Sequence, residues 1–353
     1  MSLVQAQARA RKLYMEVEYR KESLRDTTLP EYARTQFDPV ANYRLAHHST
    51  LKSHQDKVAG ISWGQSTKLL SCSTDGFMFL WDSVTGYKHS AVKMESSWML
   101  TCALSPGEDI AVAGGLDNTA SVYRLREGEV TQYSDTQLRG HRQYISGCGF
   151  MDRSTLVTSS GDRMCVVWDV SRGLATTTFD HTHDVLCVDV RDAHTFISGS
   201  SDGTINVWDA RVPQPVQSFI SRKSGDVSCL KSYGSSSSFV CGTEDGALRI
   251  YDSRSDCSIA TLPFDASSYK NIAKMDATVS AGSIMSVDVS VGYRMIYATY
   301  KGINHAVVWD TMRGEIVGQV GNNKSQVAQV KVAPTGMALA TSSWDGSLRV
   351  YSV

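Results

Sequence analysis

From position 44 onward, short apolar runs alternate with polar turn residues, and the runs end in an aromatic residue at nearly constant intervals. Runs of four to six residues bounded by Asp, Gly and Ser are typical of β-strands separated by tight turns. The aromatics are separated by 42, 45, 40, 43, 58 and 42 residues, at Trp81, Tyr123, Trp168, Trp208, Tyr251, Trp309 and Tyr351. An Asp stands six residues before six of the seven, at Asp75, Asp117, Asp162, Asp202, Asp245 and Asp345.

A period in the low forties with Asp-Gly turns and a Trp-Asp ending predicts an all-β fold, a seven-bladed WD-repeat β-propeller over residues 40–353. The last repeat has only three strand-like runs, whereas a blade needs four: Val327–Val332, Ala338–Ser342 and Leu348–Tyr351. We therefore expect residues 44–51 to supply the outer strand of that blade. Pairing of the N- and C-terminal strands then closes the ring and removes its open edges.

The sixth interval departs from the period. It is 58 residues long, and Ile303 stands where the other repeats carry Asp. The stretch near residues 263–281 is polar. We interpret it as a surface insertion of roughly fifteen residues, which is tolerated because the entropy of loop closure grows slowly with length.

Residues 1–35 form a separate N-terminal segment. No Gly or Pro precedes Pro30, and residues that favour helices predominate. Apolar side chains at heptad a and d positions predict a coiled-coil α-helix that needs a partner helix, with Arg20 interrupting one seam. The alternative is a helix folded against its own propeller. The a and d residues are Leu3, Ala6, Ala10, Leu13, Val17 and Leu24.

Composition argues against several classes of function. A net charge of −1 and a pI near 6.7 give no basis for binding nucleic acid. No apolar run approaches the roughly 18 to 20 residues that cross a bilayer, and Ser2 stands where myristoylation requires Gly. The eight cysteines form no Cys-x-x-Cys pair, so we interpret them as buried, reduced thiols of a cytoplasmic protein.

Sets of His, Ser, Asp and Trp resemble a catalytic triad, but they recur at the repeat period. One set is His54, Ser73, Asp75 and Trp81. The same types return as His141, Ser159 or Ser160, Asp162 and Trp168, and again as His181 or His183, Ser200, Asp202 and Trp208. A hydrogen-bond network that recurs from blade to blade belongs to the scaffold, whereas an active site occurs once. We therefore expect a structural network, no enzymatic activity, no metal site and no cofactor.

Several strings are more specific than the repeat itself. Asp38-Pro39-Val40 joins the helix to the propeller, and Ser96-Ser97-Trp98 leads into Thr101-Cys102-Ala103. The others are Gly114-Gly115-Leu116-Asp117-Asn118, Thr158-Ser159-Ser160-Gly161-Asp162 and Ser342-Ser343-Trp344-Asp345-Gly346. With the N-terminal heptads, these strings make the chain resemble a heterotrimeric G-protein β subunit over essentially its whole length, as a divergent member of that family.

The resemblance implies a signalling subunit that forms an obligate dimer with a γ subunit through the heptad residues named above. One propeller face would bind the GDP-bound α subunit and, after its release, downstream effectors. Lipidated partners would hold the dimer at the cytoplasmic face of the plasma membrane. The positions that match the α- and effector-binding surface are Lys57, Lys88, Ser97, Trp98, Leu100, Leu116, Asn118, Tyr144, Asp184, Leu186, Asp226, Glu244 and Trp344.

Trp98 and Trp344 stand outside the repeat pattern, so we expect them on the binding face, whereas Trp81 should lie in the core. Departures from the family leave the identity of the effectors open, at Gln55, Ala59, Phe77 and Phe79. Two other functions are considered. A generic WD-repeat scaffold or adaptor would pair its helix with itself, and a propeller hydrolase would need one unique buried acid–base cluster.

Overall fold

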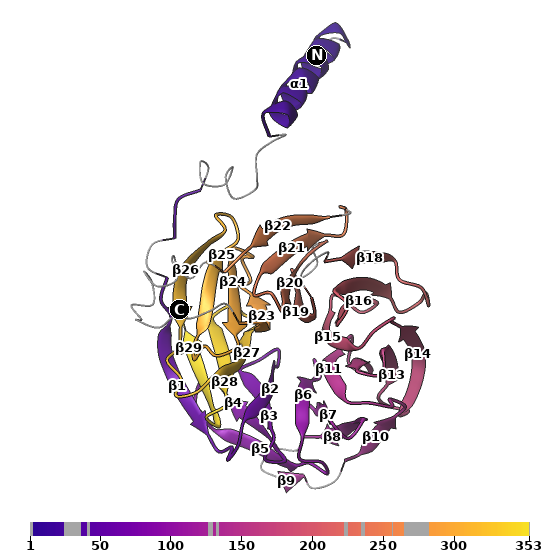
Figure 1. Cartoon of the computed structure of the whole chain (residues 1–353), viewed down its shortest axis with the longest axis vertical. Coiled ribbons are helices and arrows are strands. Elements are labelled where there is room, and N and C mark those ends of the chain that lie inside the picture. The colour runs from indigo at the N-terminus through magenta and orange to yellow at the C-terminus, as the bar shows by residue number, and fades with distance from the viewer. Residues whose placement is uncertain are drawn as a thin grey trace.

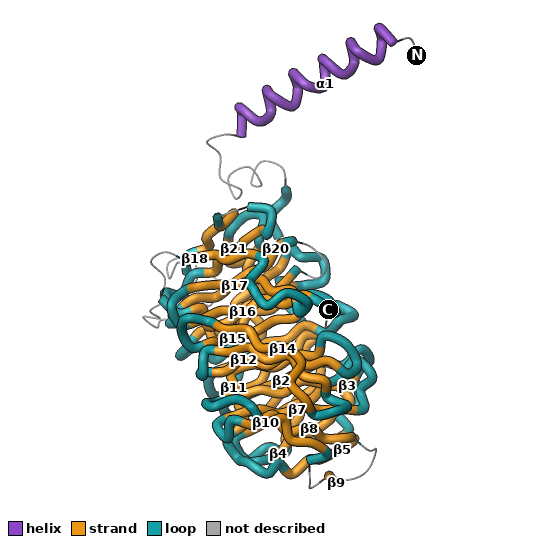
Figure 2. The backbone as a smooth tube through the Cα atoms, turned by 90° about the vertical axis from the view of Figure 1, so that its right-hand side faces the viewer, coloured by secondary structure: helices purple, strands orange, loops and turns teal. Residues whose placement is uncertain are grey.

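In its described residues, the computed structural model is a β-propeller in which seven sheets surround a central channel and one helix lies outside the ring (Figure 1). Viewed from the side, the helix extends away from the propeller (Figure 2). The predicted fold class is therefore confirmed. The structure describes residues 3–24, 37–40, 43–125, 130–131, 134–221, 225–233, 237–255, 257–264 and 282–352.

Each blade contains four antiparallel strands, of which the first lines the channel and the last lies toward the rim. The helix α1 spans Leu3–Leu24. Blades 1 to 4 contain β2 (Val58–Trp63), β3 (Lys68–Ser73), β4 (Phe77–Asp82), β5 (Lys88–Lys93); β6 (Met99–Leu104), β7 (Ile110–Gly115), β8 (Thr119–Arg124), β10 (Thr136–Arg139); β11 (Ile145–Phe150), β12 (Thr155–Ser160), β13 (Met164–Asp169), β14 (Leu174–Asp180); and β15 (Val185–Val190), β16 (Thr195–Ser200), β17 (Thr204–Asp209), β18 (Gln217–Ile220). Blades 5 to 7 contain β19 (Val227–Ser232), β20 (Ser238–Thr243), β21 (Leu248–Asp252), β22 (Ser258–Leu262); β23 (Ile284–Val289), β24 (Met295–Tyr300), β25 (Ala306–Asp310), β26 (Glu315–Val320); and β27 (Val327–Val332), β28 (Ala338–Ser343), β29 (Ser347–Ser352), β1 (Ala46–Lys52).

The two ends of the propeller close the ring within blade 7. β1 pairs antiparallel with β29, from Ala46 opposite Ser352 to Lys52 opposite Ser347. The prediction that residues 44–51 complete the last blade is thus confirmed, with a shift of one or two residues in its bounds. Leu51 anchors this outer strand because its side chain is 2 % exposed and packs in the core between blades 7 and 1.

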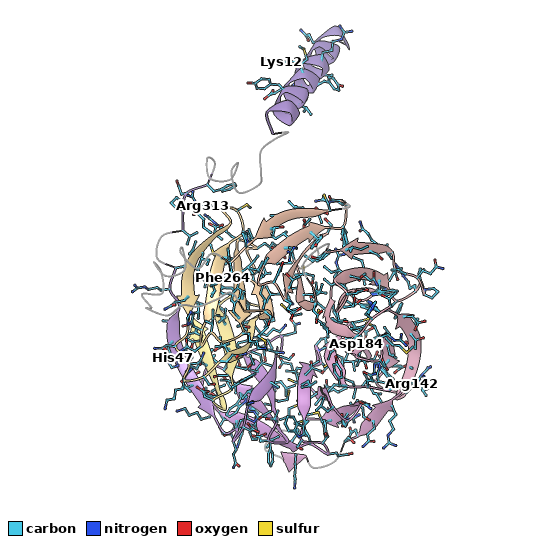
Figure 3. All side chains as sticks on the ribbon, in the orientation of Figure 1. Lys12, His47, Arg142, Asp184, Phe264 and Arg313 are labelled. Atoms are coloured by element: carbon cyan, nitrogen blue, oxygen red, sulfur yellow. The ribbon has the colours of Figure 1, made fainter. Side chains whose placement is uncertain are left out.

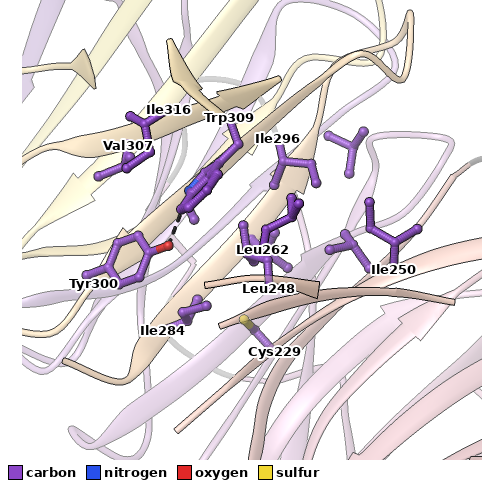
Figure 4. Close-up of a cluster of buried hydrophobic side chains, with 14 of the residues drawn as sticks. Cys229, Leu248, Ile250, Leu262, Ile284, Ile296, Tyr300, Val307, Trp309 and Ile316 are labelled. Carbon is purple, nitrogen blue, oxygen red and sulfur yellow. Dashed lines mark hydrogen bonds between the residues drawn. The ribbon is translucent and has the colours of Figure 1, made fainter. Parts of the chain in front are cut away.

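The core lies between neighbouring blades, where each sheet packs its face against the next. Figure 4 shows the cluster that joins blades 5 and 6, in which Leu248 and Ile284 pack beside Trp309. The indole N–H of Trp309 donates a hydrogen bond to the Tyr300 hydroxyl at 3.2 Å, so this buried donor is satisfied. Middle strands such as β3 are buried on both faces, because each face of the sheet is covered by a neighbouring blade.

Blade 1 carries a fifth strand that the repeat pattern does not predict. β9 (Val130–Thr131) comes from the connection between β8 and β10 and pairs in parallel with β5, the outer strand of blade 1. It therefore covers a sheet edge that would otherwise face solvent. Nearby, Glu95 accepts a hydrogen bond from the Ser134 hydroxyl at 2.7 Å, which ties this connection to the loop between blades 1 and 2.

The recurring His, Asp and Trp residues form hydrogen-bonded chains inside the blades. In blade 1, His54 Nδ1 lies 3.1 Å from the Asp75 carboxylate, and His54 Nε2 lies 2.9 Å from the Ser71 hydroxyl. The Trp81 indole donates to the same hydroxyl at 2.9 Å. Burial opposes ionisation of Asp75, but hydrogen bonds from His54 and from the Gln55 amide leave the pKa of this carboxyl below its ordinary value.

The same chain occurs in blades 3 and 4 with one variation. In blade 3, His141 bonds Asp162 at 2.9 Å and Thr158 at 2.7 Å, and Trp168 donates to Thr158 at 2.8 Å. Blade 4 divides the histidine role between two residues. His181 bonds Ser198 and His183 bonds Asp202, while Trp208 donates to Ser198.

The prediction of which hydroxyl joins the histidine to the tryptophan is wrong in all three blades. Ser71, Thr158 and Ser198 connect His to Trp, not Ser73, Ser159 or Ser160, and Ser200. The reason is the strand geometry: the Trp lies opposite Leu69, so its indole reaches the next residue on the same face, which is Ser71. Ser73 sits at the turn, where its hydroxyl donates to the Asp56 carbonyl.

Seven cysteines are buried or partly buried, as expected, but Cys257 is exposed. The prediction of a buried thiol is therefore wrong for Cys257, which stands in the turn before β22 instead of inside a strand. Burial raises the pKa of Cys148 and Cys165 to about 12, so these thiols stay protonated at neutral pH. The insertion predicted near residues 263–281 lies mostly outside the described residues. Phe264 is described, and its ring centroid lies 4.8 Å from that of Tyr300.

Candidate functional site

A backbone hydrogen bond repeated in all seven blades defines one face of the propeller. In each blade, the amide of the first residue after the second strand donates to the carbonyl of the residue just before the first strand. The seven N···O distances lie between 2.9 and 3.1 Å. Because every channel-lining strand begins at this face and every second strand ends there, the bonded residues form two concentric sets of equivalent positions.

We name these sets the loop ring and the turn ring. The loop ring consists of Lys57, Trp98, Tyr144, Asp184, Asp226, Ser283 and Gln326. The turn ring consists, in the same blade order, of Thr74, Leu116, Gly161, Ser201, Glu244, Lys301 and Trp344. Eight of the thirteen residues predicted to bind the α subunit or effectors fall on the two rings, so the structure brings them together on a single face.

An aromatic arc runs across blades 7, 1, 2 and 3. It consists of Trp344, Lys57, Trp98, Leu116 and Tyr144. Trp98 is 60 % exposed, Leu116 51 % and Trp344 38 %, whereas the repeat residue Trp81 is 3 % exposed. The ammonium group of Lys57 lies 4.4 Å from the centroid of the Trp344 ring. Large apolar side chains held open to solvent by a rigid backbone are typical of protein-binding surfaces.

An acidic arc follows, formed by Asp184 of blade 4 and by Asp226 and Glu244 of blade 5. Burial and the nearby charge of Glu244 raise the pKa of Asp226 above its ordinary value. Burial and the charges of Asp184 and Asp226 likewise raise the pKa of the Tyr144 phenol. Like charges thus face one another on this arc, which favours a partner that brings a basic group to it. Asp184 is labelled in Figure 3.

Gly115 fixes the position of the Trp98 loop. A Cβ at this residue would collide with the Trp98 carbonyl oxygen and would come within 2.8 Å of the Met99 Cα. The adjacent Gly114 has no room for a Cβ beside Ile145. Gly115 therefore serves close packing within blade 2, and Gly114 serves the packing of blade 2 against blade 3.

Four further predicted residues flank the rings. Ser97 is exposed beside Trp98, and Asn118, at a φ of 59°, donates through its side-chain amide to the Arg142 carbonyl at 3.2 Å. Leu100 and Leu186 are the second residues of β6 and β15 and are partly buried. Each follows a loop-ring residue, Trp98 or Asp184, by two positions, and Leu186 also lines the channel.

Lys88 is separate from this face. It begins β5, opposite Trp81, at the end of the blade remote from the bonded turn, and its ammonium group lies 4.7 Å from the Phe79 ring centroid. Phe79 itself is 6 % exposed and packs on His54, so this departure from the family changes the core and not the surface.

The N-terminal helix presents its described heptad side chains to solvent. Leu13 is 54 % exposed and Val17 is 50 % exposed, and Ala10 is exposed as well. The side chains of Leu3, Ala6 and Leu24 lie outside the described part of the chain. Within the described residues, no helix combines the length and the apolar character needed to cross a bilayer.

The central channel encloses a cavity of about 570 Å³, and three of the charged groups that line it serve the scaffold. Lys231 lies 3.2 Å from Asp189 and 3.9 Å from Asp288, and so links blades 4, 5 and 6. Asp189 and, against the opposing effect of burial, Asp288 hold the pKa of Lys231 above its ordinary value. In the described residues, no group of three or more His, Cys, Asp or Glu side chains could hold a metal ion.

Sequence reasoning missed six ring positions: Thr74, Gly161, Ser201, Ser283, Lys301 and Gln326. The signal that could have found them is positional. Each ring residue comes directly before a first strand or directly after a second strand, whatever its chemical type.

Residues 1–352 match a family model described as G protein beta WD-40 repeat protein. The chain belongs to the G-protein β-subunit family. It is 33 % identical to the guanine nucleotide-binding protein subunit beta of Saccharomyces cerevisiae, over 98 % of this chain and 89 % of that protein. It is 30 % identical to the protein of the same name from Arabidopsis thaliana, over 94 % and 91 % of the two chains.

The fold also matches the crystal structure of the WD40 β-propeller domain of Doa1. The TM-score is 0.72 at 17 % identity, and the match covers 87 % of this chain and 96 % of that one. At this identity the likeness concerns the fold alone. The role shared by the G-protein β-subunit family is that of the β subunit of a heterotrimeric G protein, and the family is generally non-enzymatic.

Proposed function

We propose that this β subunit pairs with a γ subunit through α1 and binds the GDP-bound α subunit on the face defined by the loop and turn rings. After release of the α subunit, the same face binds effectors. The observation that carries the proposal is the aromatic arc, where Trp98 and Trp344 are exposed although every other described Trp is buried or half-buried.

The arc has the composition of an interface centre. Trp and Tyr combine a large contact area with few rotatable bonds, so they lose little entropy when a partner covers them. The acidic arc beside them supplies charge that orients an incoming partner. Asn118 and Ser97 offer polar groups at the rim of the same surface.

Pairing with γ is supported by the exposed heptad residues of α1. A helix of 22 residues with apolar side chains on one stripe is marginal alone in water and gains stability when a second helix covers the stripe. A lipidated γ subunit would also hold the dimer at the cytoplasmic face of the plasma membrane.

The mechanism is competition for one surface. Nucleotide exchange on the α subunit changes its affinity for the face, and effectors bind when the α subunit leaves. A partner that covers Trp98 and Trp344 excludes any other partner from the same residues. No conformational change of the propeller is required by this scheme.

The test uses the dimer co-expressed with a γ chain and immobilised GDP-loaded α subunit. Trp98→Ala should weaken binding by about 2 kcal/mol, roughly thirtyfold in affinity. Tyr87→Ala is the matched control, because Tyr87 is 61 % exposed but lies at the opposite end of its blade. Equal binding by both variants would refute the assignment of the face. A full-length chain that is soluble and monodisperse without γ, and stays so after deletion of residues 2–27, would refute obligate pairing.

A further inference from the structure

We propose that Lys301, in blade 6, contacts an acidic side chain of the bound partner and fixes the rotational position of that partner on the propeller. The inference rests on the proposed function, since it concerns the same face. It adds a residue that the family resemblance did not supply and states the chemistry that this residue recognises.

Structural equivalence places Lys301 on the binding face. Its amide donates to the Ser283 carbonyl at 2.9 Å, which is the bond that defines the turn ring. Lys301 thus holds in blade 6 the position that Leu116, Glu244 and Trp344 hold in blades 2, 5 and 7.

The backbone of Lys301 is fixed while its side chain is available. The next amide, that of Gly302, donates to the Gln326 side-chain oxygen at 3.1 Å, and the Ile303 amide donates to the Tyr300 carbonyl at 3.1 Å. The Lys301 residue is exposed. Among the described residues, its ammonium group takes part in no hydrogen bond or ion pair, in contrast to Lys231 of the channel.

The pseudo-symmetry of the ring gives this charge its role. Seven equivalent positions could in principle receive a partner in several rotated orientations, because the backbone pattern is the same in every blade. Side chains must therefore break the symmetry. Going around the face, the acidic arc of Asp226 and Glu244 is followed by the cation of Lys301 and then by Trp344.

A partner that sets a basic group on the acidic arc and an acidic group on Lys301 satisfies both charges in one orientation. Rotation by one blade toward blade 6 would bring its basic group against Lys301, and rotation the other way would separate its acidic group from Lys301. Juxtaposed like charges oppose binding strongly, so the incorrect orientations are disfavoured.

The experiment measures the affinity of the co-purified γ-bound dimer for GDP-loaded α subunit at low and at high salt. Lys301→Glu should lower the affinity at least about tenfold at low salt, and less at high salt, where the charges are screened. Lys301→Arg should bind like the unaltered dimer. Lys52→Glu makes the same change of charge on the exposed outer strand β1 and should change affinity less than about twofold.

Equal affinities of the Lys301→Glu and Lys52→Glu dimers would overturn the inference. Trp98→Ala separates this failure from failure of the proposed function. If Trp98→Ala weakens binding and Lys301→Glu does not, the face is correct and only the role of Lys301 is wrong. If neither variant weakens binding, the proposed face is wrong. Thermal unfolding of each dimer verifies that the variants are folded.

Discussion

The ammonium group of Lys57 and the ring of Trp344 are in cation–π contact, 4.4 Å from nitrogen to ring centroid. Lys57 precedes the first strand of blade 1, and Trp344 follows the second strand of blade 7. The contact therefore crosses the interface between blades 7 and 1. The electrostatic attraction between an ammonium group and an indole face holds the Trp344 ring in place before any partner arrives.

Removing this contact should change binding in a non-additive way. Trp344→Ala should weaken binding of GDP-loaded α subunit by about 2 kcal/mol, since it removes an aromatic anchor. Lys57→Met keeps the apolar stem and should cost about 0.5 to 1 kcal/mol through loss of the cation. The double variant should cost less than the sum, as measured by calorimetry on all four dimers. Additivity within about 0.3 kcal/mol would show that the two residues act independently.

Gly115→Ala should damage the binding face without touching any side chain of the aromatic arc. The added Cβ has no room beside the Trp98 carbonyl and the Met99 Cα, so the Trp98 loop must move. We expect loss of about 1 to 3 kcal/mol of stability and a weaker affinity for the α subunit. Gly292→Ala is the control, because nothing lies within 4 Å of a Cβ at that position. A Gly115→Ala dimer with unchanged melting temperature and affinity would contradict the prediction.

Thr158→Val should destabilise blade 3 through the loss of one hydroxyl. This nearly isosteric change leaves the Trp168 indole N–H without its acceptor and His141 Nε2 without its partner. A buried polar group that loses its partner costs about 1 to 3 kcal/mol, so the loss should be measurable by chemical or thermal unfolding. Thr158→Ser keeps the hydroxyl and should retain most of the stability. Equal destabilisation by the two variants would indicate packing, not hydrogen bonding, as the cause.

Acidification should destabilise the propeller through buried histidines. Burial lowers the pKa of His305 to about 4, and burial likewise lowers that of His181 to about 4 against the opposing charge of Asp202. The unfolded chain therefore binds more protons between pH 6.5 and 4, and stability falls as the pH drops through this range. At pH 5 the loss amounts to about 2 kcal/mol per histidine.

The matching variant is His305→Gln, which removes one titrating group. Its free energy of unfolding should depend less steeply on pH between 7 and 5 than that of the unaltered chain, whatever its absolute stability. His48→Gln changes an exposed histidine and should leave the slope as it is. An unchanged slope for His305→Gln would exclude His305 as a source of the pH dependence.

The repeat pattern predicted the number of blades and the strand that closes the ring, because both follow from a strict alternation of apolar and turn residues. It also placed Trp98 and Trp344 at the surface, since they stand outside the alternation. It could not identify Ser71 as the shared acceptor, because this depends on how the third strand lies against the second. Nor could it foresee β9, whose two residues pair only when blade 1 is already in place.

The candidate face was predictable in part. Motifs found the aromatic and acidic residues whose types match the family, but Lys301 has no such signature. Its equivalence to Trp344 emerges only from the repeated backbone bond, and that bond is a property of the folded ring. Residue type identified some members of the surface, and position in the fold identified the others.

The pairing of β1 with β29 determines when the ring can close during synthesis. A ribosome makes Ala46–Lys52 long before Ser347–Ser352, so blade 7 stays incomplete until β29 has been made. The helix α1 precedes both strands in the chain, so it can meet another helix while the six blades between them are still being made. A message cut short anywhere upstream of Ser347 therefore yields an open arc with unpaired edges, and the cell obtains either a complete ring or a substrate for its quality control.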